Sequence, residues 1–118
     1  MTYAEDSDVE FRLNTGDYQS LVSDQIENCR DRAYRDIQEE FVKNGLESPD
    51  TDGDDVGVLV DIEADLAAYY YRRDRAEFND EEKGYKERMW KKDAYSKLER
   101  YINARHGNMG FMAGGGGN

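Results

Sequence analysis

The longest regular pattern of apolar residues lies between Leu13 and Phe41. Its apolar residues recur every three or four positions, which places them on one side of an α-helix: Tyr18, Val22, Ile26, Cys29, Ala33, Ile37 and Phe41. Asp17 or Ser20 is a suitable N-cap, because a short side-chain oxygen accepts a backbone N–H that the first turn leaves unpaired. The pattern predicts an amphipathic helix of about 25 residues that ends near Asn44.

Two more helices are predicted further along the chain. One runs from about Asp54 to Glu77 and has the inner face Val58, Leu59, Ile62, Leu66, Tyr69 and Tyr70. The other runs from Glu81 to Arg105 and is anchored by Tyr85, Met89, Trp90, Ala94, Leu98, Tyr101 and Ile102. Residues 2–14 predict one or two helical turns that fold back on the first long helix. We therefore expect an all-α fold, a bundle of three long helices with a short N-terminal helical segment and a flexible glycine-rich C-terminal tail.

The C-terminal sequence HGNMGFMAGGGGN contains too much glycine to favour a regular element. This divides the chain into a helical domain, residues 1–106, and a tail, residues 107–118. Met109, Phe111 and Met112 give the tail apolar side chains, which suit an arm that orders on a partner's surface. A disordered end is the alternative, and the residues leave both open.

The acidic excess of the chain bears on which kinds of partner it can bind. The chain has 27 acidic and 16 basic residues and a net charge of -11. Between Lys43 and Arg72 the charged residues are all acidic, which repels phosphate and argues against sequence-specific nucleic-acid binding. Such acidity is typical of proteins adapted to high salt, although an ordinary acidic protein has the same balance. It also suits a small acidic regulator that binds a basic partner or mimics DNA.

The motifs point away from catalysis. His106 and Cys29 are the only histidine and cysteine, and we find no nucleophile with a positioned base, so we expect no enzyme, cofactor or metal. SPDTDGDD at 48–55 resembles part of a calcium loop, but Leu59 stands where such a loop needs a bidentate glutamate. A turn followed by a helix cap is favoured, and cation binding by Asp50–Asp55 stays open. The N-terminus lacks an apolar leader, and we expect no membrane segment.

Aromatic and basic residues gather near the end of the second long helix. Tyr69, Tyr70 and Tyr71 with Arg72 and Arg73 suit stacking on bases, but packing between subunits is favoured. Three consecutive tyrosines cover most of a helix circumference, so we expect at least one outside the core of its own chain. The candidate interface residues are Tyr69, Tyr70, Tyr71, Arg72, Arg73, Trp90, Tyr95, Tyr101, Met109, Phe111 and Met112.

Four segments carry a family resemblance: AEDSDVEFRLN, SLVSDQIENCRDRAYRDIQEEF, VLVDIEADLAAYYYRRDR and YKERMWKKDAYSKLERYINARHG. In this order of short helix, long helix, acidic turn and arginine-ended helix, the chain resembles the head-tail connector (adaptor) proteins of tailed viruses over roughly residues 4 to 105. The strongly acidic balance and the long glycine end depart from that family. If the acidity reflects salt adaptation, the resemblance points to a tailed virus of haloarchaea.

The resemblance implies a ring of identical subunits, usually dodecameric, in the virion neck, assembled in the host cytoplasm. The partners would be the portal protein and a stopper or tail-completion protein, and genomic DNA would pass through without specific binding. Carboxylates that line the channel would repel DNA phosphates, and the candidates are Asp50, Asp52, Asp54, Asp55, Asp61 and Asp65. Another neck component, a head- or tail-completion protein, is the alternative within virions.

Overall fold

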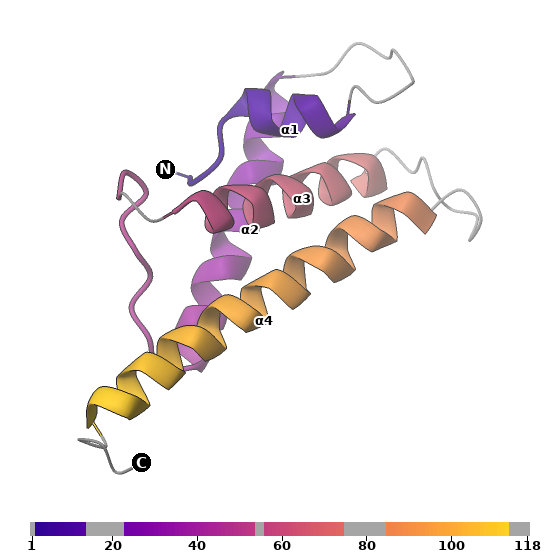
Figure 1. Cartoon of the computed structure of the whole chain (residues 1–118). Helices are drawn as coiled ribbons and strands as arrows, with labels where there is room; N and C mark the ends of the chain where they lie inside the picture. Colours follow the sequence, from indigo (N-terminus) through magenta and orange to yellow (C-terminus); the bar gives the residue numbers. More distant parts are fainter. Residues whose placement is uncertain (1, 14–22, 54–55, 75–84, 114–118) are drawn as a thin grey trace.

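The computed structural model describes residues 2–13, 23–53, 56–74 and 85–113; the side chains of residues 23, 74, 85–87 and 107–113 lie outside this description. These residues form four α-helices and no strand: α1 (Asp6–Leu13), α2 (Ser23–Lys43), α3 (Gly57–Asp74) and α4 (Tyr85–Ala113) (Figure 1). The all-α prediction is confirmed for this part of the chain. Tyr18, Val22, Asp17 and Ser20 lie outside it.

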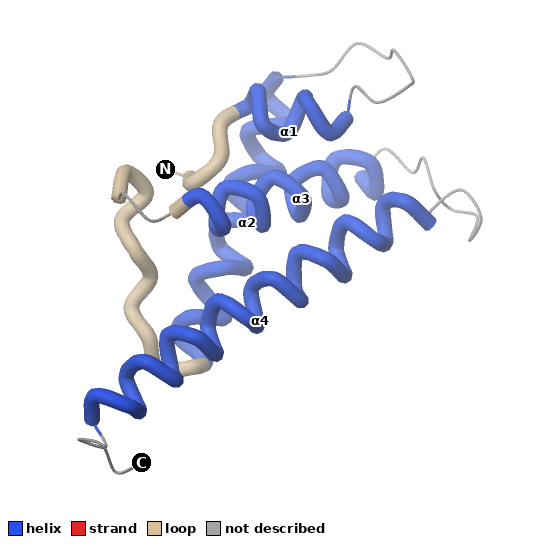
Figure 2. Tube along the Cα trace, viewed as in Figure 1, coloured by secondary structure: helices blue, strands red, loops and turns tan. Residues whose placement is uncertain are grey.

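Helix α3 is the central element and packs against α1, α2 and α4 (Figure 2). Helix α1 lies mainly on α3 and touches α2 less, whereas the sequence predicted that it folds back on α2. The reason is that Val9 and Leu13, one turn apart, are both buried and anchor α1 in the groove between its neighbours.

Helix α3 is buried on almost all sides, which explains its weak amphipathic pattern. Leu59, Ile62 and Leu66 are fully buried, as predicted, and so are the alanines Ala64, Ala67 and Ala68. Small alanine side chains let neighbouring helices approach closely. The prediction for Val58 is wrong: it is 47% exposed, because it lies in the first turn on the same side as the exposed Asp61.

The end of α2 follows the sequence prediction. Gly45 adopts a positive φ of 68°, the left-handed conformation that glycine reaches without a Cβ penalty. The Leu46 N–H donates to the Phe41 carbonyl at 2.9 Å, and Leu46 is buried beneath the turn. The helix therefore stops one residue before Asn44, with its last carbonyls partly satisfied.

Helix α4 extends to Ala113, past the predicted end at Arg105. The first seven residues of the predicted 107–118 tail thus belong to this helix in the structure. Extending an existing helix fixes one residue per new hydrogen bond, so it tolerates glycines at a cost of about 1 kcal/mol each. The side chains of Met109, Phe111 and Met112, and residues 114–118, lie outside the described part.

Candidate interaction surface

The three consecutive tyrosines belong to the chain's own core. Tyr69, Tyr70 and Tyr71 are only 8%, 6% and 3% exposed. The expectation that at least one would lie outside the core is wrong, because α3 is central and its residues 62–71 are all buried. As candidate interface residues, these tyrosines are therefore not presented to a partner by the isolated chain.

Cationic side chains near these tyrosines also serve internal contacts. The guanidinium of Arg32, on α2, lies 4.2 Å from the centroid of the Tyr70 ring on α3. The guanidinium of Arg73, on α3 itself, lies 4.8 Å from the same ring centroid. The Tyr70 hydroxyl donates to the Asp36 carboxylate, and burial followed by this bond raises the tyrosine pKa. The Arg72 Nη2 donates to the Leu13 carbonyl at 3.0 Å. This cluster joins α1, α2 and α3 and is not arranged for stacking on bases.

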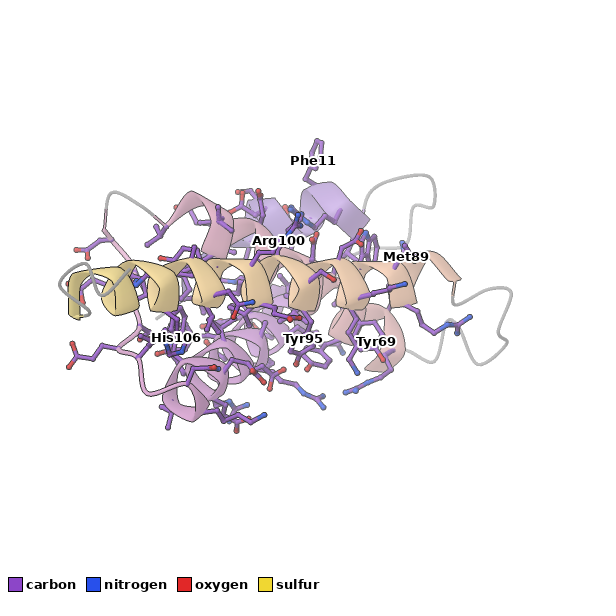
Figure 3. The ribbon with its side chains drawn as sticks, turned by 60° about the horizontal axis from the view of Figure 1, so that its bottom comes forward. Phe11, Tyr69, Met89, Tyr95, Arg100 and His106 are labelled. Carbon is purple, nitrogen blue, oxygen red and sulfur yellow. The ribbon has the colours of Figure 1, made fainter. Side chains whose placement is uncertain are left out.

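Three other predicted interface residues are half-buried along α4. Trp90, Tyr95 and Tyr101 are partly buried and pack against the core; Tyr95 is labelled in Figure 3. Tyr101 meets Phe41 edge-on, with ring centroids 5.9 Å apart. Burial, and then the nearby Asp36 carboxylate, raise the pKa of Tyr95. These residues pack α4 against the core, and only part of each is exposed to a partner.

The candidate channel carboxylates fall into two groups. Asp50 and Asp52 are exposed in the turn that the Gly53 N–H closes onto the Asp50 carbonyl, and the Asp61 side chain is 61% exposed. Asp65 is buried: the Arg12 Nε lies 2.5 Å from its carboxylate, and the Lys97 Nζ lies 3.6 Å away. Asp54 and Asp55 lie outside the described residues.

No group of three potential metal ligands is found among the described residues. The turn predicted at 48–55 is present where the structure describes it, with the Ser48 hydroxyl bonded to Gln38 and the Pro49 carbonyl accepting from the Tyr3 hydroxyl at 2.7 Å. These hydrogen bonds attach the segment to the N-terminal residues and to α2. The turn therefore contributes to the fold.

Sequence reasoning missed a buried carboxylate at the centre of the fold. Glu63 is fully buried and accepts the backbone N–H groups of Tyr3 and Ala4, at 3.0 and 2.9 Å. Burial raises its pKa to about 7, while the two N–H groups and Arg30 act in the opposite direction. The available signal was the position of Glu63 directly after the inner-face residue Ile62 of α3.

Arg30 holds the same N-terminal segment from the other side. Its guanidinium donates to the Thr2 hydroxyl at 2.7 Å and to the Ala4 carbonyl at 2.6 Å, and its Nε lies 2.8 Å from the Asp6 carboxylate. Glu63 accepts from the backbone N–H groups of Tyr3 and Ala4, and Arg30 donates to the backbone carbonyl of Ala4, so these buried backbone groups all have hydrogen-bond partners. We call Glu63 and Arg30, with the Thr2–Ala4 backbone, the N-terminal junction.

Sequence reasoning also missed two exposed apolar side chains. Phe11 is 76% exposed and Val42 is 75% exposed, although both belong to well-packed helices. Phe11 points away from the body of the molecule (Figure 3). The signal was present in the spacing, because Phe11 stands midway between the buried Val9 and Leu13 and therefore points to the other side of α1.

Val42 lies in an exposed hollow along α2 of about 530 Å³, lined mostly by apolar atoms of Arg35, Gln38, Glu39, Val42 and Lys43. These positions share one face of α2, opposite in part to the buried Ile37 and Phe41. Long side-chain stems flank Val42 and leave their charged ends in water. The hollow is suited to an apolar side chain that protrudes from another surface and has a carboxylate beside it that can approach Arg35 or Lys43.

Comparison with known proteins gives no match, whether with protein-family models, with curated proteins or with solved structures. Among the described helices, none has the length and apolar character that crossing a bilayer requires.

Proposed function

We propose that this chain is a virion structural protein, a head-tail adaptor that forms a ring, dodecameric as in the family it resembles, between the portal and the tail or stopper. The observation that carries the proposal is the exposure of Phe11 and Val42, at 76% and 75%. Phe11 belongs to the aromatic residues that are enriched in protein–protein interfaces relative to the rest of the surface.

The fold is consistent with this role. We propose that α2, α3 and α4 act as a three-helix bundle, with α1 as an attached segment, and that the chain end beyond α4 serves as an arm toward a neighbouring ring. Helices joined by buried polar contacts give a stiff subunit, and stiffness preserves the geometry of a closed ring. Asp50, Asp52 and Asp61 remain candidates for a channel wall, because their carboxylates are exposed.

The main alternative is a small acidic regulator that mimics DNA. A mimic needs carboxylates at regular spacing on an open face. The ion pairing of the buried Asp65 with Arg12 removes this carboxylate both from such a face and from a channel wall, so it does not discriminate between the two functions. The tyrosines of α3 lie in the core in either case and do not discriminate.

The test is binding to the portal of the virus that encodes the chain. Purified protein is mixed with portal rings and sedimented, with the portal of an unrelated tailed virus as control and a basic protein such as lysozyme as competitor. An adaptor co-sediments with its own portal and is seen as an added ring by negative-stain imaging. A protein that binds lysozyme and ignores the portal would contradict the proposal.

A further inference from the structure

One exposed surface lies on α1. Ser7, Glu10 and Phe11 share a face of this helix, which we call the α1 surface; Ser7 and Phe11 are exposed and Glu10 is half-buried. Within the described residues, the Glu10 side chain forms no ion pair or hydrogen bond. The α1 surface therefore presents an aromatic knob beside an available carboxylate.

The second surface is the hollow on α2, formed by Arg35, Gln38, Glu39, Val42 and Lys43, which we call the α2 surface. Arg35 is exposed and, among the described residues, its guanidinium has no ion-pair or hydrogen-bond partner. Lys43 lies 3.2 Å from Glu40 in an exposed pair, which leaves Arg35 as the available cation. This surface offers an apolar floor around Val42, with the Arg35 guanidinium and the exposed Glu39 carboxylate at its edge.

The geometry points to a contact between copies, and this inference rests on the proposed ring: we propose that the α1 surface of one subunit binds the α2 surface of the next. Phe11 would enter the hollow over Val42, and Glu10 would pair with Arg35. The occupant of the α2 surface is thus a second copy of this chain.

Shape and charge together favour this arrangement over a symmetric one. If two α1 surfaces met each other, the Glu10 carboxylates would face each other, and two α2 surfaces would leave both hollows without a protruding apolar side chain to fill them. The mixed pairing instead joins opposite charges and two apolar side chains. Figure 1 shows α1 beside the early part of α2, while the last turns of α2 lie toward the other end of the molecule. One chain therefore does not cover its own hollow, and a head-to-tail contact that closes gives a ring.

The first experiment is cysteine crosslinking in a Cys29→Ala background, which removes the buried native thiol. Ser7→Cys and Glu39→Cys place a thiol on each surface and leave Phe11 and Val42 intact, since both replaced residues are exposed. We expect disulfide-linked dimers only when the two single-cysteine proteins are mixed, and a ladder of higher oligomers when one chain carries both cysteines. Dimers of Ser7→Cys alone, or no mixed dimer, would overturn the inference.

The second experiment is charge reversal, read as the dissociation constant of self-association by light scattering or sedimentation. Glu10→Arg and Arg35→Glu are each expected to weaken association on the order of tenfold, and the double variant is expected to regain most of it. Val58→Ser, which changes an exposed apolar residue outside both surfaces, is the matched control and should have no effect. A double variant no better than either single variant would contradict the pairing.

The two proposals fail in different ways. Rings that bind the portal but give no mixed crosslink would retain the adaptor function and overturn this contact. Mixed crosslinks with open filaments and no portal binding would retain the contact and overturn the adaptor function. A wild-type chain that stays monomeric at every concentration and forms no ring on the portal overturns the contact outright. Far-ultraviolet circular dichroism of each variant separates loss of the interface from loss of the fold.

Discussion

The N-terminal junction and the two exposed apolar surfaces depart from ordinary burial in opposite ways. At the junction, the carboxyl group of Glu63 is fully buried, and its oxygens accept hydrogen bonds from the backbone N–H groups of Tyr3 and Ala4. On α1 and α2, the apolar Phe11 and Val42 remain mostly in water. Removing a buried polar partner damages the fold, whereas removing an exposed apolar side chain leaves it intact. The comparison therefore separates residues that hold the subunit together from residues available to a partner.

The largest expected effect is at the junction. Glu63→Ala leaves two buried N–H groups without an acceptor, and each such group costs about 1 to 3 kcal/mol, so we expect a loss of about 4 kcal/mol in the free energy of unfolding. The measurement is urea denaturation at pH 5, followed by circular dichroism. Ser7→Ala, at an exposed position, is the control. A loss below about 1 kcal/mol would show that the junction contributes little to the fold.

The second effect is a pH dependence with a defined sign. Folded Glu63 keeps its proton up to a pKa of about 7, whereas the ordinary value is 4.5. Because the folded pKa is the higher one, the contribution of this proton to the free energy of unfolding is complete below pH 4.5. It is lost as the pH rises through 7, and the total loss is about 3 kcal/mol.

The stability difference between wild type and Glu63→Gln, measured by urea denaturation from pH 4 to pH 8, isolates this residue from the other titrating groups. As the pH rises, we expect wild type to lose about 3 kcal/mol in the free energy of unfolding relative to Glu63→Gln. A difference that stays constant, or that moves in the other direction, would contradict the pKa of the buried carboxyl.

These regions also show how far the sequence could be read. The three long helices and the end of α2 at Gly45 follow from spacing and turn residues, which act locally. Spacing placed Tyr69 and Tyr70 on the inner face of α3, and both are buried. The burial of Tyr71 was not predictable, because it depends on this end of α3 being covered on its other sides as well, which is a property of the tertiary fold. The pairing of Glu63 with residues 59 and 60 positions earlier is equally non-local.

The third effect compares two carboxylates one turn apart on α3. Asp65→Ala removes the main partner of the Arg12 guanidinium, whose side chain is only 19% exposed, so we expect a loss of about 2 kcal/mol. Asp61→Ala, at a carboxylate that is 61% exposed, should cost less than about 0.5 kcal/mol. Thermal and urea unfolding of both variants provide the measurement. Equal losses would mean that burial does not distinguish these two acids.

The smallest effect on stability is expected at the exposed surfaces. Phe11→Ser and Val42→Ser should each change the free energy of unfolding by less than about 0.5 kcal/mol, because neither side chain is packed within its own subunit. Self-association, measured on the same samples by sedimentation, should nevertheless weaken. A destabilisation as large as that of Asp65→Ala would assign these side chains to the fold and remove the distinction between the two regions.

The most direct test of the central claim is the mass of the purified wild-type protein in low and high salt, measured by light scattering and native mass spectrometry and accompanied by negative-stain imaging. An adaptor is expected to form a closed ring of identical subunits, or to remain a monomer that assembles into such a ring on portal. A monomer or dimer at both salt concentrations that forms no ring when portal is added would contradict the account.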